Sequence, residues 1–267
     1  MPSSSPTHDT DAVRAAADRL RAAASDHAPC APVRDLIGAD DIALAYAVQD
    51  RLTDDRLASG ATIVGRKIGL TSPAVQRQLG VDRPDFGVLF HDMDLTAAET
   101  VPLGRLLQPK AEAEIAFVLG ADLVDGPLDD AQVRAAVDYA CAAIEIVDSR
   151  IAQWDITFGD TVADNGSSGL FVLGAERRTL DDYAPVDATM TMAVDGAEAS
   201  SGTGAACLGD PLAALAWLAR TAREHGRPLL AGQIILSGAL GPMVSVTGPC
   251  TVTTEVSGLG SVTAVFA

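Results

Sequence analysis

The chain has 267 residues, of which 48% are hydrophobic, so it is long enough for one large domain or for a domain with a smaller attachment. Its formal net charge of −17 argues against nucleic acid as a partner, because an acidic surface repels a phosphate backbone. No apolar run approaches the length of a membrane span, and the polar N-terminal segment, without an apolar signal region, predicts a cytoplasmic protein.

The N-terminal part of the chain predicts a tail followed by a helical layer. Residues 1–10 are polar and predict a disordered tail. Residues 11–60 predict two helices with apolar side chains at helical spacing, the second of them capped by Asp40 or Asp41. We expect this helical region to lie against the main body of the protein, residues 61–267.

The main body predicts many strands and few helices. Strands are expected at about 62–70, 99–104, 110–119, 142–147, 169–173, 187–194, 232–237, 250–256 and 261–266. Helices are expected after three capping residues, Ser72, Asp129 and Asp210, with the helix after Asp129 running to about residue 139. Pro84–Gly87 predicts a turn and residues 156–168 predict a loop. Because the strands follow no regular βαβ rhythm, the sequence predicts an α+β fold built on a curled mixed sheet.

Three glutamates lie in strand-like, apolar surroundings. Glu112 and Glu114 are two residues apart, so their carboxylates share one face of a strand and repel each other unless a cation lies between them. Glu145 interrupts the apolar run AAIEIV, where a lone charge is costly. Oxygen ligands suit Mg²⁺, Mn²⁺ or Ca²⁺, so these residues are candidate metal ligands. The alternatives are a solvated edge strand for the pair, and for Glu145 a salt bridge to an arginine or an outward-facing position.

Other candidate site residues have ordinary structural alternatives. Lys67 lies in an apolar strand pattern and needs a partner or a role, unless its stem only reaches toward the surface. Asp85 follows Pro84, where aspartate commonly makes local hydrogen bonds. Ser167 and Ser168 close an Asn-Gly-Ser-Ser-Gly loop that can hold a carboxylate or can make turn contacts only. The histidines are scattered and the four cysteines form no CxxC pair, so a zinc site, a disulfide framework and a Ser-His-Asp triad have little support.

Four segments carry a resemblance to a known family. They are GRKIGLTSPAVQRQLGV (65–81), RPDFGVLFHDM (83–93), QPKAEAEIAFVLGADL (108–123) and IEIVDSRIAQWDITFGDTVADNGSSGLFVLG (144–174). With these segments in order and at family-like distances, the chain resembles the 2-keto-4-pentenoate hydratase (2-hydroxypenta-2,4-dienoate hydratase) group of the fumarylacetoacetase (FAH) superfamily. The resemblance covers most of residues 40–267.

The resemblance implies a fold and a set of site residues. Residues 61–267 would form an FAH-like catalytic domain with a curled mixed sheet. The ligands of a Mg²⁺ or Mn²⁺ ion would be Glu112, Glu114 and Glu145. The acid/base residues would be Lys67 of the KIGLTS motif and Asp85 of PDFG. The substrate-binding residues would be Ser72 and Ser168, with Ser167 as the less favoured alternative to Ser168.

The resemblance also implies an activity and partners. The expected enzyme is a hydro-lyase that adds water to 2-hydroxypenta-2,4-dienoate or a close analogue and gives a 4-hydroxy-2-oxo acid, as in meta-cleavage aromatic catabolism. The alternatives are a 2-oxo-3-hexenedioate (4-oxalocrotonate) decarboxylase and a non-catalytic partner subunit. The segments PKAEAEIAF and SRIAQWDITFGDTVADNGSSG favour the hydratase. A homo-oligomer is expected, together with association with a related decarboxylase or a downstream aldolase, and no nucleic acid or membrane partner.

Overall fold

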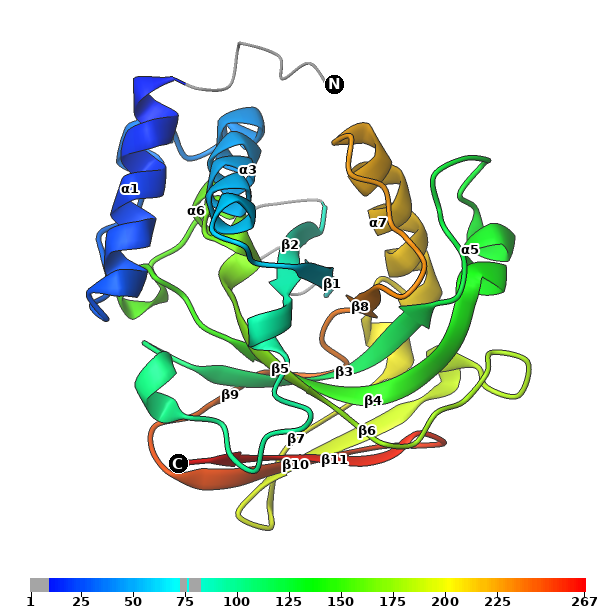
Figure 1. Ribbon diagram of the computed structural model, residues 1–267. Coiled ribbons are helices and arrows are strands. Elements are labelled where there is room, and N and C mark those ends of the chain that lie inside the picture. Colours follow the sequence, from blue (N-terminus) through cyan, green and yellow to red (C-terminus); the bar gives the residue numbers. More distant parts are fainter. Residues whose placement is uncertain (1–9, 73–75, 77–82) are drawn as a thin grey trace.

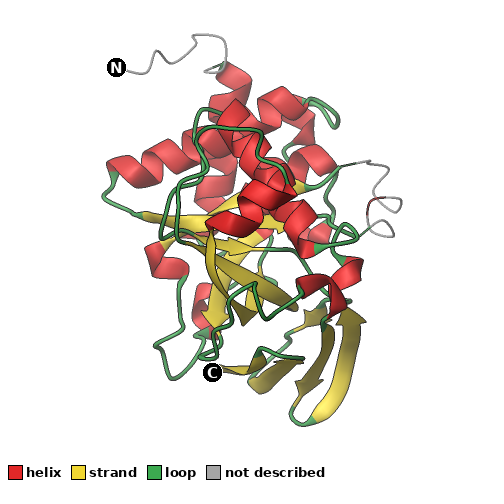
Figure 2. Ribbon diagram, turned by 90° about the vertical axis from the view of Figure 1, so that its right-hand side faces the viewer, coloured by secondary structure: helices red, strands yellow, loops and turns green. Residues whose placement is uncertain are grey.

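The computed structural model describes residues 10–72, 76 and 83–267. The predicted disordered tail lies outside the described residues except for Thr10, and so does most of the helix predicted after Ser72. Figures 1 and 2 show three layers: a group of helices, a larger curled sheet beneath them, and a smaller sheet packed on the far side of the larger one. The fold is therefore α+β, as the sequence predicts.

Helices cover the open side of the larger sheet (Figure 1). The α-helices are α1 (Asp11–Ser25), α2 (Arg34–Ile37), α3 (Ile42–Ala58), α5 (Asp130–Ala136), α6 (Phe158–Ala163) and α7 (Pro211–Glu224). Short 3-10 helices are η1 (His91–Met93), η2 (Leu103–Arg105), η3 (Ala152–Trp154), η4 (Asn165–Ser167), η5 (Pro185–Asp187) and η6 (Gly204–Ala206). No described helix is long and apolar enough to cross a membrane.

The N-terminal helices begin at side-chain caps. Thr10 accepts a hydrogen bond from the amide of Val13, and Asp41 accepts one from the amide of Leu44. Asp41, and not Asp40, therefore caps the second predicted helix. Helices α1 and α3 pack on each other and bury an apolar stripe of α1 that includes Leu20. This arrangement confirms the predicted N-terminal helical layer.

The larger sheet has the strand order β2-β1-β8-β3-β4-β5, with β9 beside β3, within the described part of the chain. Its strands are β1 (Ile63–Gly69), β2 (Asp85–Phe90), β3 (Lys110–Leu119), β4 (Val137–Val147), β5 (Ser168–Leu173), β8 (Ile234–Leu236) and β9 (Val244–Ser245). The pair β1–β8 is parallel and the other pairs are antiparallel, so the sheet is mixed, as predicted.

The smaller sheet has the order β11-β10-β6-β7. Its strands are β6 (Thr189–Val194), β7 (Ala197–Thr203), β10 (Cys250–Val256) and β11 (Gly260–Phe266). Strands β6 and β7 form a hairpin through Asp195 and Gly196, which both have positive φ angles. Asp-Gly is a strong hairpin signal, and it was available in the sequence, although β7 was not predicted. Strands β10 and β11 lie against β3 and β4 of the larger sheet.

Three predicted elements differ in the structure. The last three residues of the predicted turn Pro84–Gly87 belong to β2, whose six residues are all buried, because β2 pairs with β1 and the chain does not reverse direction there. The predicted strand 99–104 makes one isolated bridge, between Val101 and Phe266, and then enters η2. The helix predicted after Asp129 ends at Ala136, where β4 takes over five residues earlier than expected.

The predicted loop 156–168 contains a short helix and a closing contact. Helix α6 is preceded by its cap Thr157, which forms a reciprocal capping box with Asp160. After α6, the side chain of Asn165 accepts a bond of 2.7 Å from the amide of Val88 and donates one of 2.9 Å to its carbonyl. Val88 belongs to β2 and Ser168 begins β5, and these two strands are the opposite edges of the larger sheet. Residues 165–168, hereafter the seam, therefore join the two edges and close the curl.

Candidate metal centre and active site

Three carboxylates meet on the larger sheet because of strand register. Glu112 on β3 lies directly opposite Glu145 on β4, so both side chains leave the same face. Glu114 is two residues further along β3 and shares that face. One carboxylate oxygen from each residue lies within 4.8 Å of the other two. The predicted set of candidate ligands is thus brought together, from positions that are 33 residues apart at most.

These carboxylates have the properties of a cation site. All three side chains are buried, and Glu114 Oε1 and both oxygens of Glu145 accept no hydrogen bond from the described residues. Burial, with the neighbouring Glu145 adding to it, raises the pKa of Glu112 to about 7. Burial and the same neighbour raise the pKa of Glu114 well above its usual value. Buried, unsatisfied, mutually repelling oxygens are what a divalent cation with oxygen ligands would stabilise, so the residues fit such an ion.

A lysine and a fourth carboxylate lie beside the three glutamates. Lys67 on β1 is 3% exposed, and its Nζ lies 3.5 Å from Oε1 of Glu145. Asp85, the first residue of β2, is 1% exposed and lies opposite Gly69 of β1. Neither residue has the ordinary structural role considered for it, because Lys67 does not reach the surface and Asp85 does not lie in a turn. The structure therefore brings the predicted acid/base candidates to the predicted metal ligands.

Lys67 and Asp85 affect each other's charge. Burial favours the neutral lysine, but the carboxylates of Glu145 and Asp85 outweigh it, so the pKa of Lys67 is raised. Burial also raises the pKa of Asp85, against the opposing effect of Lys67. Asp85 Oδ1 accepts no hydrogen bond from the described residues, which leaves one oxygen available to another molecule. The pair can hold a proton at either group, as proton transfer requires.

Two glycines make room for this pair. A Cβ atom at Gly69 would lie 2.1 Å from Oδ1 of Asp85 and 3.3 Å from Nζ of Lys67. Gly166 of the seam has a φ of +61°, and a Cβ there would lie 2.8 Å from Cε of Lys67. A glycine inside a strand pattern is a sign of such close approach, so the motif KIG carried a signal that the sequence analysis did not use.

One further contact to the glutamates was not predicted. The amide of Gly238, which follows β8, donates a hydrogen bond of 2.8 Å to Oε2 of Glu114. Gly238 has a φ of +105°, a conformation that favours glycine. This amide leaves Oε1 as the carboxylate oxygen of Glu114 that faces the other two glutamates without a hydrogen bond. The sequence gives little sign of this contact, because Gly238 and Glu114 are 124 residues apart in the chain.

The predicted substrate-binding serines lie in different surroundings. Ser72 is half-buried just after β1, and its carbonyl accepts a hydrogen bond from the amide of Gln76. Ser168 is buried at the start of β5, and its hydroxyl donates a bond of 2.7 Å to the carbonyl of Asn165. Ser167 is also buried, and its hydroxyl lies 3.2 Å from that of Thr161. No distance places any of these hydroxyls on a substrate, so their roles stay predictions.

These features define a class of protein: an α+β fold with a buried cluster of three carboxylates, which fits a divalent cation, beside a lysine–carboxylate pair. The sequence pattern of the family described as fumarylacetoacetate (FAA) hydrolase C-terminal matches residues 68–267. The chain belongs to this family.

Relatives and solved structures agree with that assignment. The chain is 54% identical over 258 residues to the TodF product hydratase of Pseudomonas putida. This alignment covers 97% of this chain and 96% of that protein. It is 52% identical over 258 residues to the 2-keto-4-pentenoate hydratase of Burkholderia vietnamiensis, covering 97% and 98%. The structure of 4-oxalocrotonate decarboxylase from Pseudomonas putida, complexed with magnesium and adipate, matches with a TM-score of 0.91 and 33% identity over 96% of this chain and 97% of that chain. The predicted fold and family resemblance are confirmed.

Proposed function

We propose that this protein is a metal-dependent hydratase of 2-hydroxypenta-2,4-dienoate or a close analogue. The observation that carries the proposal is the identity of 52% over nearly the whole chain to an enzyme named 2-keto-4-pentenoate hydratase. The site supports it, because the three buried glutamates, Lys67 and Asp85 lie together. The substrate would lose its enol proton and gain a proton at C5, water would then add its oxygen at C4 while C3 gains a proton, and the product would be a 4-hydroxy-2-oxo acid.

The metal ligands that we propose are Glu112, Glu114 and Glu145, and the proposed ion is Mg²⁺ or Mn²⁺. The structure with 33% identity contains magnesium, and carboxylate-only sites suit either ion. When bound, such an ion would orient a 2-oxo acid through its carboxylate and C2 oxygen and would stabilise negative charge there. It would also supply positive charge to attract an anionic substrate in a protein with a net charge of −17.

Lys67 and Asp85 are the proposed proton-transfer residues. Lys67 holds a proton at Nζ because the surrounding carboxylates raise its pKa, and Asp85 Oδ1 is free to accept one. One of them would donate the proton to C5 and the other would take a proton from the attacking water. We further propose that Ser72 and Ser168 help to hold the substrate, a role in which the hydroxyl of Ser168 would exchange its present partner, the carbonyl of Asn165.

A decarboxylase is the second candidate function. The observation in its favour is the TM-score of 0.91 to 4-oxalocrotonate decarboxylase, which shows that the same scaffold hosts that activity. The identity to that decarboxylase is 33%, however, against 52% to the enzyme named as a hydratase. A non-catalytic subunit is the third alternative, and the assembled site argues against it.

One assay separates these functions. The purified protein with Mg²⁺ is expected to consume 2-hydroxypenta-2,4-dienoate, followed by the loss of its ultraviolet absorbance, and to release no CO₂ from 2-oxo-3-hexenedioate. Release of CO₂ at the faster rate would favour the decarboxylase. Loss of neither substrate in a sample with stoichiometric metal would favour the non-catalytic subunit.

We also propose that the protein is a homo-oligomer that can associate with a related decarboxylase or a downstream aldolase. Two large apolar side chains are exposed on the β-rich body. Val265 of β11 is 38% exposed, and Met243, which directly precedes β9, is 39% exposed. Light scattering at micromolar concentration is expected to give a multiple of the 27.4 kDa chain mass. A monomer mass under these conditions would contradict the proposal. The cytoplasmic location, the meta-cleavage pathway and the division of the chain at residue 60 stay predictions.

A further inference from the structure

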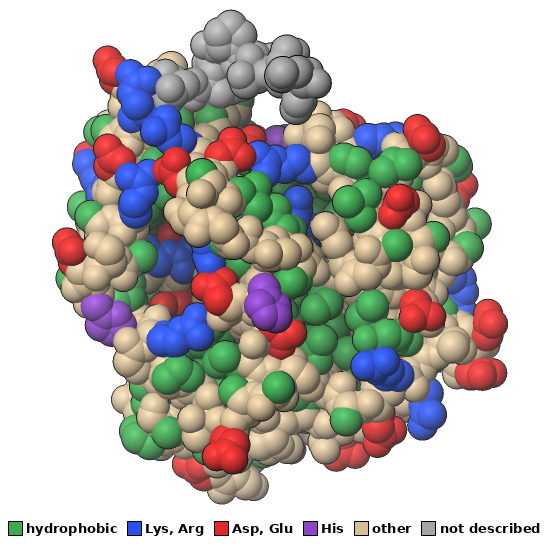
Figure 3. Space-filling view, in the orientation of Figure 1, with side chains coloured by type: hydrophobic (Ala, Val, Ile, Leu, Met, Phe, Trp, Pro, Cys, Tyr) green, Lys and Arg blue, Asp and Glu red, His purple; other side chains and the backbone are tan. Residues whose placement is uncertain are grey.

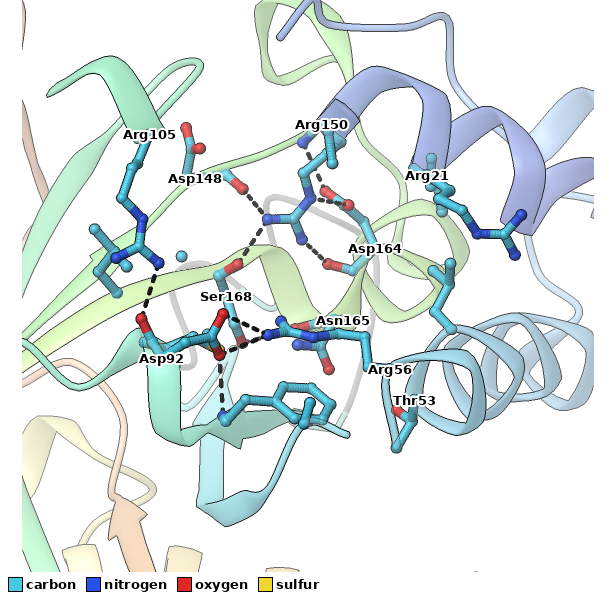
Figure 4. A pocket seen from close by; sticks show the side chains of 18 of the residues that line it. Arg21, Thr53, Arg56, Asp92, Arg105, Asp148, Arg150, Asp164, Asn165 and Ser168 are labelled. Atoms are coloured by element: carbon cyan, nitrogen blue, oxygen red, sulfur yellow. Dashed lines mark hydrogen bonds and ion pairs between the residues drawn. The ribbon is translucent and has the colours of Figure 1, made fainter. Parts of the chain in front are cut away.

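The structure contains a cavity that the proposed metal ligands and proton-transfer residues do not line. It has a volume of about 510 Å³, within the range of small-molecule sites, and lies where α1 and α3 cover the seam. Figure 3 shows the molecule hollowed beneath α1, and Figure 4 looks into the cavity. Lys67, Asp85 and the three clustered glutamates do not line it, whereas Asn165 and Ser168 of the seam do. The seam is therefore a wall between the cavity and the candidate active site.

The floor of this cavity is apolar. It is formed by side chains that come from α1, α3, η1, the strand edges and the segment after η2: Leu20, Leu52, Phe90, Met93, Leu106 and Leu170. Leu20, Phe90 and Leu170 are each at most 3% exposed, so they form a fixed surface of the core. Such a floor favours a ligand with a hydrocarbon or aromatic body.

Four arginines and four aspartates line the cavity, so their formal charges balance, but one arginine has no carboxylate partner among the described residues. Arg150 is held by Asp164 and by the carbonyls of Asp148 and Ser168, so it belongs to the wall. Arg21 pairs with Asp55. These guanidinium groups have little capacity left for a ligand.

The arginine without a carboxylate partner is Arg105. Asp92 binds Nη2 of Arg56 through both carboxylate oxygens, at 2.6 and 2.8 Å, while Arg105 donates only to the carbonyl of Asp92, at 2.8 Å (Figure 4). The remaining carboxylate, Asp148, accepts the amides of Leu107 and Gln108. Among the described residues, Arg105 therefore has no carboxylate partner. The cavity offers one guanidinium fork above an apolar floor.

From this arrangement we infer that the cavity is a second binding site, for a small monocarboxylate with an apolar body. A carboxylate matches the guanidinium fork of Arg105, and Arg56, stacked 3.9 Å above the ring of Phe90, lies on the other side of Asp92. A doubly charged anion is disfavoured, because the four arginines that line the cavity are matched by four aspartates and only Arg105 lacks a carboxylate partner among the described residues. The carboxylate can belong to an aromatic or an aliphatic acid.

The test is calorimetric titration of the full-length, Mg²⁺-loaded protein with benzoate and, separately, with pentanoate. At least one acid is expected to bind with a Kd below about 1 mM, and the two titrations distinguish an aromatic from an aliphatic ligand. Arg105→Met is expected to weaken binding about tenfold or more, since it removes a charge-assisted hydrogen bond. Ala24→Trp, at an exposed position of α1 that lines the cavity, should weaken it similarly by filling the space.

Two control variants make the result specific. Arg223 donates one hydrogen bond to a backbone carbonyl, as Arg105 does, but lies outside the cavity, so Arg223→Met should leave the affinity unchanged. Glu114→Gln alters only the candidate metal centre and should also leave it unchanged. Binding that is lost in Glu114→Gln and kept in Arg105→Met would place the acid at the metal and overturn the inference. Absence of saturable binding below about 10 mM would overturn it as well. Neither outcome depends on which reaction the enzyme catalyses.

Discussion

Lys67→Met and Asp85→Asn are each expected to lower kcat roughly a hundredfold or more, because each removes a group that transfers a proton. Both side chains are almost fully buried beside the three glutamates, where surface screening does not weaken their interactions. If they had only ordinary surface roles, replacing either would change stability by about 0.5 kcal/mol or less and would leave turnover almost intact. The measurement is steady-state hydration of 2-hydroxypenta-2,4-dienoate with saturating Mg²⁺.

Controls separate a catalytic loss from a folding loss. Both variants should fold and should bind Mg²⁺ nearly normally, because neither residue is a proposed ligand. Arg178→Met and Asp138→Asn, which change exposed charges of the same kinds, should keep parental turnover. Exchange of the C3 protons of the 2-oxo product in D₂O tells the two roles apart, since a variant that exchanges but does not hydrate has lost only the water-addition step. Turnover within a few-fold of the parent in both variants would show that the catalytic assignment is wrong.

Removal of the metal is expected to abolish activity. EDTA should stop hydration and Mg²⁺ or Mn²⁺ should restore it. Glu112→Gln, Glu114→Gln and Glu145→Gln should each weaken metal binding about a hundredfold or more, since even changes behind the ligands of a metal cost roughly 10- to 100-fold. The measurement is a Mn²⁺ titration followed by electron paramagnetic resonance.

A measurement of stability would test the assignment of the metal ligands without using activity. In the metal-free protein the pKa of Glu112 is about 7, above its unfolded value, so the folded state retains protons that the unfolded chain releases. The free energy of unfolding should therefore fall as pH rises from about 4.5 toward 7, and added Mg²⁺ should reverse the loss. Glu255→Gln, at an exposed position of β10, is the control and should not change metal affinity. Full activity in a sample shown by elemental analysis to lack metal would contradict the metal assignment.

Much of the site was predictable because it depends on local rules. The two-residue spacing of Glu112 and Glu114 fixes a shared strand face, and an isolated glutamate in AAIEIV indicates an unusual environment. What the sequence does not contain is the register that sets Glu145 opposite Glu112, or the curl that brings Lys67 to 3.5 Å from Glu145. Those follow from the pairing of whole strands, and the resemblance to a family supplied only the set of site residues in advance.

The missed elements show where local rules fail. Pro-Asp-Phe-Gly has the composition of a turn, but pairing with β1 draws its last three residues into a buried strand. The cavity beneath α1 could not be predicted from the sequence. Its apolar floor and the guanidinium group of Arg105 come from residues between Leu20 and Leu170 that belong to no single motif. Such a site exists only after the helical layer has been placed over the seam.

The close approach of Gly69 and Gly166 to Lys67 limits how this enzyme can diversify. A side chain at Gly69 would lie against Oδ1 of Asp85 and Nζ of Lys67 and would displace them, so random mutagenesis at that position should yield almost no active clones. A library aimed at longer or bulkier substrates is therefore best directed at positions other than Gly69. The same restriction makes the Gly69 codon a useful landmark for recognising, in newly read genomes, which distant homologues still have space for the lysine–aspartate pair.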